Sequence, residues 1–250
     1  MNRNRMKAED ETLDAFYHGR IKILQKIKGY RFALDAPLLA DFIRTNENDE
    51  LLEFGTGNGI VSLLLSLHPF KHITAVEVQA SLAELARKNI KLNHLEKRIT
   101  VVEQDLVQFQ TENKYDIIFS NPPYHKKDEG HLSPLEEKSV AKHELKCTIF
   151  DIMQKTAALL KRNGRAYFVF PEKRKDDIEE AGKMNGLKMK SRRAVVVHKK
   201  ASPNLFLIEY DFLSQNLEQQ PDLILYDEEG NYTQETQEIF SGRPHASSLQ

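Results

Sequence analysis

The middle of the chain alternates short apolar runs with amphipathic segments, a pattern typical of a parallel β-sheet covered by helices. Several apolar runs are nearly continuous, as expected for strands buried on both faces. Segments 81–92 and 148–161 carry apolar residues at helical spacing, and Asn163-Gly164 is expected to end the second helix. The predicted strands are 51–54, 72–78, 99–103, 115–120, 164–170, 194–198 and 205–212. The predicted fold class is therefore α/β, with a mostly parallel sheet and helices on both faces.

Three regions lie outside this alternation: the two ends of the chain and a polar insertion in its middle. The pattern therefore predicts an N-terminal extension over 1–34, a main domain over 35–214 and a C-terminal extension over 215–250. In the C-terminal extension, 223–226 predicts a short strand, 227–230 a turn, and Thr233 the cap of a helix that ends near Phe240. The main domain also contains a long polar insertion over 124–146, whose mixed charge favours a lid.

Composition narrows the class of protein. The chain has 250 residues, of which 40% are hydrophobic and 29% charged. No apolar run approaches the roughly 20 residues that span a bilayer, and the N-terminus is too charged for a secretory signal. We therefore expect a soluble cytoplasmic protein with no membrane partner. Cys147 is the only cysteine, which rules out an intrachain disulfide, and no histidine spacing matches a metal site, so no metal is expected.

The net charge of −1 conceals an uneven distribution of charge. Residues 15–34 and 183–200 contain basic side chains and no acidic one, whereas the segment after Ser214 is acidic. Two acid-free basic stretches favour a polyanionic partner such as RNA. The candidate RNA-binding residues are Lys188, Lys190, Arg192, Arg193, Lys199 and Lys200 in the second stretch, and Lys126 and Lys127 in the insertion.

A glycine loop follows the first predicted strand. Its glycines, Gly55, Gly57 and Gly59, lie between Glu53 and an apolar helix, where they allow a tight bend and the close approach of a ligand. The third glycine comes one residue too early for the dinucleotide fingerprint, which disfavours a nicotinamide cofactor. Glu77 stands at the end of the next strand, and Asp105 stands just past the strand after that. A carboxylate at the first position can accept bonds from a ribose diol, and one at the second can accept a bond from an adenine amine.

The tetrapeptide Asn121-Pro122-Pro123-Tyr124 follows the buried strand 115–120. Proline fixes its own φ near −65° and disfavours helix in the residue before it, so the pair of prolines predicts a rigid, open loop. The Asn121 side chain and the Pro122 carbonyl can each accept a hydrogen bond there. Tyr124 offers a flat ring on which a base can stack.

Together, the glycine loop, Glu77, Asp105 and the tetrapeptide 121–124 resemble the class I S-adenosylmethionine-dependent methyltransferases. Within that superfamily, residues 29–40 and 141–144 resemble the bacterial valine-tRNA adenine-N6 methyltransferases. The resemblance implies a Rossmann-like, seven-stranded sheet whose last strand is antiparallel, and S-adenosyl-L-methionine as cofactor. It implies cofactor contacts from Asp35, Glu53, Gly55, Gly57, Gly59, Glu77, Val78, Asp105, Leu106 and Asn121, and a catalytic loop of Asn121, Pro122, Pro123 and Tyr124.

The expected reaction is methyl transfer to an exocyclic amine. Two carbonyl acceptors, from Asn121 and Pro122, would hold the amine hydrogens and direct the nitrogen lone pair toward the methyl group. The resemblance implies adenine N6 beside the anticodon of valine tRNA as the target. The chemistry alone also fits methylation of guanine N2 in ribosomal RNA, of DNA adenine or of a protein glutamine amide. A non-catalytic RNA-binding protein and a nicotinamide oxidoreductase are further, less favoured readings.

Overall fold

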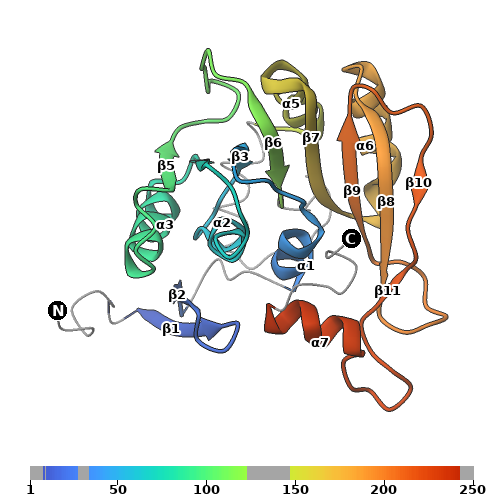
Figure 1. Ribbon diagram of the computed structural model, residues 1–250, viewed down its shortest axis with the longest axis horizontal. Helices are drawn as coiled ribbons and strands as arrows, with labels where there is room; N and C mark the ends of the chain where they lie inside the picture. The colour runs from blue at the N-terminus through green and yellow to red at the C-terminus, as the bar shows by residue number, and fades with distance from the viewer. Residues whose placement is uncertain (1–7, 9, 28–33, 123–146, 243–250) are drawn as a thin grey trace, which may run out of the picture.

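One central β-sheet organises the protein (Figure 1). The computed structural model describes residues 8, 10–27, 34–122 and 147–242. The strands run in the order β10-β8-β9-β7-β6-β3-β4-β5, with β11 also paired to β8. Their bounds are β3 Glu50–Phe54, β4 His72–Glu77, β5 Ile99–Glu103, β6 Tyr115–Ser120, β7 Leu160–Pro171, β8 Lys188–Val196, β9 Leu205–Asp211, β10 Glu218–Gln219 and β11 Leu223–Ile224.

The strand directions agree with the predicted topology. Strands β3 to β7 pair in parallel, and β9 runs antiparallel to both β7 and β8. The last of the seven main strands is thus the antiparallel one, as expected. The two-residue strands β10 and β11 lie parallel to β8 and extend the sheet at that side.

Helices cover both faces of the sheet. They are α1 Asp35–Phe42, α2 Ile60–Leu65, α3 Ala80–Leu92, α5 Ile149–Leu159, α6 Lys175–Met184, the 3-10 turn η2 Glu172–Arg174 and α7 Gln234–Ser241. Neighbouring strand residues supply opposite faces, because Leu51 joins one apolar cluster and Leu52 the other. The first cluster includes side chains of α1, α2 and α7, and the second includes side chains of α5 and α6. No helix among the described residues is long and apolar enough to cross a membrane.

The junction between α5 and β7 differs from the prediction. The helix ends at Leu159 and β7 begins at once with Leu160, so Asn163-Gly164 lies inside the strand and the predicted cap there is wrong. The pairing register shifts between Tyr115 and Ile117, opposite this part of β7. A Cβ atom on Gly164 would come within 2.9 Å of the Asp116 carbonyl oxygen, so this glycine permits close backbone approach.

Both ends of the described chain fold onto the first apolar cluster. Near the N-terminus, β1 (Glu11–Phe16) and β2 (Ile21–Lys26) form an antiparallel hairpin that the sequence interpretation missed. At the other end, strand β11 and α7 confirm the predicted strand and helix, and the Thr233 hydroxyl accepts the Thr236 N–H as a cap. Arg20 of the hairpin donates to the carbonyls of Ser241 and Gly242, which joins the two ends.

Candidate functional site

The carboxyl ends of four parallel strands bring the two predicted loops together. Phe54 on β3 is in register with Ser120 on β6, so Gly55 and Asn121 leave the sheet side by side. The Ser120 hydroxyl donates to the Phe54 carbonyl at 2.8 Å and joins the roots of both loops. On the other side of β3, Phe54 pairs with Val76, and Glu77 pairs with Glu103, two residues before Asp105. The glycine loop, Glu77, Asp105 and Asn121 therefore share one edge of the sheet.

The glycine loop has the backbone that its sequence predicts. Gly55, Gly57 and Gly59 have φ of 68°, 58° and 87°, which are left-handed values that favour glycine. The amides of Gly55 and Thr56 both donate to the Val76 carbonyl, which curls the loop over the end of β4. A Cβ atom on Gly55 would meet open space, so the loop leaves room there for a ligand.

Glu53 holds this loop from inside the protein. One of its carboxyl oxygens accepts hydrogen bonds from the hydroxyls of Thr56, at 2.6 Å, and of Ser62 in α2. Burial raises the pKa of Glu53 to about 7, although these two hydroxyls act in the opposite direction. The described structure thus gives Glu53 a role in shaping the loop, and a direct contact with the cofactor stays a prediction.

Glu77 supports the loop from the neighbouring strand. Its carboxylate accepts the N–H of Gly57 at 2.8 Å and the N–H of Gln79 at 2.9 Å. A carboxylate offers about four acceptor positions and can serve several donors at once, and a contact of Glu77 with ribose hydroxyls stays a prediction. Val78, which follows it, is exposed at this edge.

The remaining predicted cofactor residues lie on either side of this centre. Asp105 is half-buried and accepts the Val107 N–H, which shapes the turn after β5, and Leu106 packs against the second apolar cluster. Asp35, at the start of α1, is buried, and its Oδ1 atom has no hydrogen-bond partner among the described residues. Asp35 lines a pocket with the ends of β8 and β9, including Val195 and Leu205, and not with residues of the glycine loop.

The structure describes the first two residues of the tetrapeptide that is predicted to be catalytic. Asn121 is half-buried and Pro122 is buried, directly after β6. Pro123, Tyr124, Lys126 and Lys127 lie outside the described residues. The described part therefore places the backbone of Asn121 beside the start of the glycine loop.

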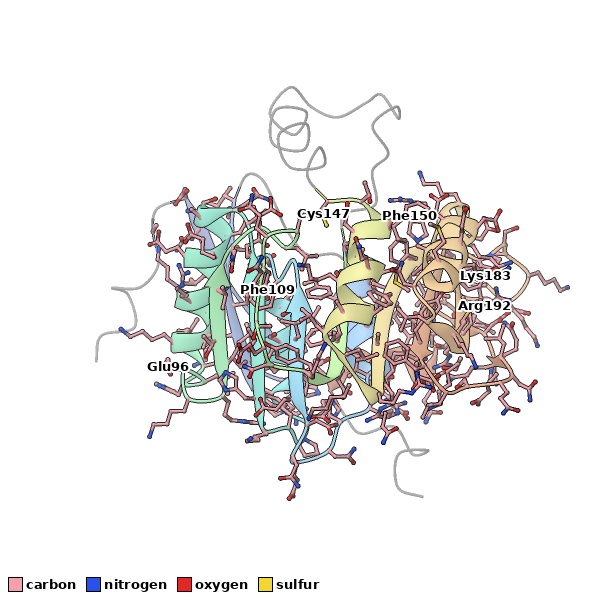
Figure 2. All side chains as sticks on the ribbon, turned by 90° about the horizontal axis from the view of Figure 1, so that it is seen from above. Glu96, Phe109, Cys147, Phe150, Lys183 and Arg192 are labelled. Atoms are coloured by element: carbon pink, nitrogen blue, oxygen red, sulfur yellow. The ribbon has the colours of Figure 1, made fainter. Side chains whose placement is uncertain are left out.

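The predicted RNA-binding residues fall into two groups. Lys190, Arg192 and Arg193 lie on β8 and pair with Glu209 at 3.0 Å, Glu179 at 3.4 Å and Glu235 at 2.6 Å. These acids come from other parts of the chain, so the basic stretch 183–200 has acidic neighbours in the folded structure although it has none in the sequence. Figure 2 shows Arg192 at the opposite side of the molecule from Glu96, which follows α3.

Lys188, Lys199 and Lys200 form the second group. All three are exposed, and none makes an ion pair with another described residue. Lys188 starts β8, whereas Lys199 and Lys200 follow its carboxyl end. Because β8 is parallel to β6, only Lys199 and Lys200 lie toward the edge that carries Asn121.

The residues present fit an adenosine-containing sulfonium cofactor. Open space above Gly55, left-handed glycines and a carboxylate at the end of β4 provide a cradle for a nucleoside with a ribose diol. No cluster that could hold a metal ion occurs among the residues that the structure describes.

Sequence reasoning missed the side chains that hold the site together. Thr56, Ser62, Ser120 and Asn89 are all buried and bonded to the loops or to Glu53. Small polar residues on apolar elements carry no distinct periodic signal. Only the position of Ser120, immediately before Asn121, could have suggested its role.

Comparison with known proteins agrees with this geometry. The family described as methyltransferase small domain matches residues 34–178. A Pedobacter heparinus protein named tRNA1(Val) (adenine(37)-N6)-methyltransferase is 32% identical over 186 residues, which cover 74% of this chain and 77% of that protein. Proteins of the same name from Dyadobacter fermentans and from Aliivibrio fischeri MJ11 are 28% and 29% identical, covering 78% and 81% of this chain and 82% and 86% of theirs.

Solved structures agree at the level of the fold. A protein described as a predicted O-methyltransferase from Agrobacterium tumefaciens has a TM-score of 0.66 at 17% identity, over 83% of this chain and 96% of that chain. Trm5b from Pyrococcus abyssi has a TM-score of 0.56 at 16% identity, over 81% of this chain and 56% of that chain. The chain belongs to the methyltransferase small domain family and is an S-adenosylmethionine-dependent methyltransferase.

Proposed function

We propose that this protein methylates the exocyclic N6 of an adenine in tRNA, with the adenine beside the anticodon of valine tRNA as its target. The observation that carries the proposal is the junction of Asn121 and Pro122 with the glycine loop at one sheet edge. The names of the relatives supply the tRNA and the position of the adenine.

Several residues are proposed to hold the cofactor. Glu77 would accept the ribose hydroxyls, Asp105 the adenine amine, and the backbone of Gly55 to Gly59 would lie against the rest of the molecule. When bound, the cofactor supplies an electrophilic methyl group on a sulfonium. Glu53 would contribute indirectly, by holding the loop in its shape. One of its carboxyl oxygens accepts hydrogen bonds from both the Thr56 and the Ser62 hydroxyls.

Asn121 and Pro122 are proposed to activate the acceptor amine. Their carbonyl oxygens would each accept one N6 hydrogen, which favours a pyramidal nitrogen with its lone pair free for in-line attack. In such a transfer the N–C bond would form as the C–S bond breaks, and the amine proton would leave to water. The products are N6-methyladenosine and S-adenosylhomocysteine. Tyr124, outside the described residues, is proposed to stack on the flipped base.

Lys199 and Lys200 are proposed as the RNA contacts closest to this site. They extend beyond β8 toward the reacting edge and are not neutralised by a described acid, unlike Lys190, Arg192 and Arg193. Phosphate contacts from lysine position an RNA without reading its sequence. Recognition of one tRNA would then depend on further contacts.

The decisive experiment uses RNA from a strain that lacks this protein. Total tRNA, total ribosomal RNA and ribosomal proteins are incubated separately with the purified protein and labelled S-adenosylmethionine, and the products are identified by mass spectrometry. We expect N6-methyladenosine in one tRNA, mapped beside the valine anticodon. Label found only as N2-methylguanosine in ribosomal RNA or as methylglutamine would replace the proposal with one of its alternatives. The absence of any label would favour a binding protein without activity.

A further inference from the structure

Helix α3 and its capping residue Asn93 provide two side chains that take the place of a neighbouring strand for β2. The Asn93 amide oxygen accepts the Lys22 N–H at 2.9 Å, and its nitrogen donates to the Lys22 carbonyl at 2.6 Å. Asn89 repeats the arrangement with Leu24, at 2.7 Å and 3.0 Å. A side-chain amide has the same donor and acceptor as a peptide group, so each asparagine imitates one peptide of a paired strand.

Helix and strand geometry make this match possible. Residues four apart on a helix are about 6 Å apart along its axis, and residues two apart on a strand are about 6.6 Å apart. Asn89 and Asn93 therefore meet Lys22 and Leu24 in register. Figure 1 shows the β1–β2 hairpin next to α3.

The two asparagines differ in the acceptor of their second side-chain amide hydrogen. The Asn93 nitrogen also donates to the Asn89 carbonyl, within its own helix. The Asn89 nitrogen donates instead to the carbonyl of Asn58, at 2.9 Å, in the middle of the glycine loop. Asn89 is completely buried, and its two donor hydrogens and its acceptor oxygen are all used.

A second contact joins α3 to the same loop. A Cβ atom on Gly59 would lie 3.4 Å from the Cβ of Ala86, which is one helical turn before Asn89. The helix thus supports the loop by packing at Gly59 and by a hydrogen bond at Asn58. A shift of β2 would act directly on Asn89, the side chain that makes the hydrogen bond to Asn58.

We propose that Asn89 is a positioning residue, which couples the docking of the N-terminal hairpin to the conformation of the cofactor loop. Through the bond to the Asn58 carbonyl, a docked hairpin favours the loop shape that binds S-adenosylmethionine. By reciprocity, the bound cofactor stabilises the docked hairpin at Leu24. Asn93 holds the same strand without reaching the loop, so it provides a matched control.

The first test compares Asn89→Ser with Asn93→Ser. Both variants lose a reciprocal pair of bonds to β2, and only the first loses the bond to the loop. Calorimetry with S-adenosylhomocysteine is expected to show a Kd raised on the order of tenfold for Asn89→Ser, and by less than about twofold for Asn93→Ser. In methylation assays the KM for S-adenosylmethionine should rise with little change in kcat. Equal changes in Kd for the two folded variants, or none, would overturn the proposal.

The second test needs no substitution and decides the matter even if the Asn89 variant does not fold. Amide hydrogen exchange of the parent protein is followed by NMR with and without S-adenosylhomocysteine. We expect the cofactor product to slow exchange at the Leu24 amide more than at the Lys22 amide, because only Leu24 is bonded to Asn89. Equal slowing at both amides, or none at either, is the contrary result.

Discussion

Individual carboxylates at this site have different tasks, although the sequence presents them alike. Glu53, Glu77 and Asp105 each lie at or near the carboxyl end of a strand. In the structure, Glu53 is buried beneath the loop, Glu77 holds two backbone amides, and Asp105 shapes a turn. Variants of the three residues should therefore affect different properties of the protein.

Glu77→Ala is expected to weaken cofactor binding for two reasons. The variant lacks the proposed acceptor for the ribose hydroxyls, and it releases the Gly57 amide that shapes the loop. The loss of charge-assisted hydrogen bonds suggests a Kd for S-adenosylhomocysteine raised by about tenfold or more. Isothermal calorimetry measures this change, with Glu96→Ala, at an exposed position after α3, as the control. An unaltered Kd in Glu77→Ala would remove Glu77 from the site.

Glu53→Gln should change how stability depends on pH. The pKa of Glu53 is raised from 4.5 to about 7 by burial, so the folded protein binds this proton more tightly than the unfolded chain does. The resulting stability is present below about pH 4.5 and is lost as the pH rises through about 7. Replacing the carboxyl group by a neutral amide removes this loss.

Urea denaturation at pH 5 and at pH 8 tests this expectation. At pH 8, Glu53→Gln should exceed the parent in free energy of unfolding by about 1–3 kcal/mol, since one pKa unit corresponds to about 1.4 kcal/mol. At pH 5, where most of the carboxyl group is protonated, the difference should be smaller. The same parent-to-variant difference at both values would show that Glu53 ionisation does not contribute.

At the scale of elements, strand β8 separates lysines that the sequence treats as one patch. Its nine residues span about 30 Å, with Lys188 at one end and Lys199 and Lys200 beyond the other. The double variant Lys199→Glu/Lys200→Glu is expected to weaken tRNA binding and to reduce the salt dependence of log Kd by about one to two units of slope. Lys188→Glu is the matched control and should change little. If Lys188→Glu has the larger effect, the RNA lies along the opposite edge.

Most sheet strands could be predicted because their apolar runs are continuous, but short and polar elements could not. Residues 99–103 and 115–120 were predicted with the bounds of β5 and β6. The start of β8 was missed, because its first six residues carry four basic side chains and Ser191, with Met189 as the single apolar residue. The hairpin was missed because its edge is completed by Asn89 and Asn93, 65 and 71 residues away from their partners in the sequence.

The candidate site was predictable where chemistry depends on a short motif. Parallel strands place their carboxyl ends together, so Glu53 to Gly59, Glu77, Asp105 and Asn121 could be assigned to one edge. The neutralisation of Lys190, Arg192 and Arg193 could not be foreseen, because their acidic partners lie 13 to 42 residues away along the chain. The density of basic residues along the sequence therefore overestimated how many of them are free of acidic neighbours at the surface.

At the scale of the molecule, the C-terminal segment completes the fold. Leu223 and Ile239 are buried in the first apolar cluster, beside residues of α1 and the hairpin. Ile239→Ala should lower the free energy of unfolding by about 2–4 kcal/mol, because it removes buried methyl groups and leaves a cavity. Chemical denaturation measures the loss, with the 71% exposed Met184 replaced by alanine as the control. A variant as stable as the parent would mean that α7 is not firmly packed.

The central claim is that Asn121 activates an amine beside a cofactor held by the glycine loop. The most direct test is the single-turnover rate of methyl transfer to tRNA from the deletion strain, measured for the parent and for Asn121→Ala, with the Kd for S-adenosylhomocysteine measured in parallel. By analogy with the removal of one oxyanion donor, the rate should fall on the order of 10² or more while the Kd stays within about twofold. An unchanged rate in Asn121→Ala, at full cofactor binding, would contradict the account.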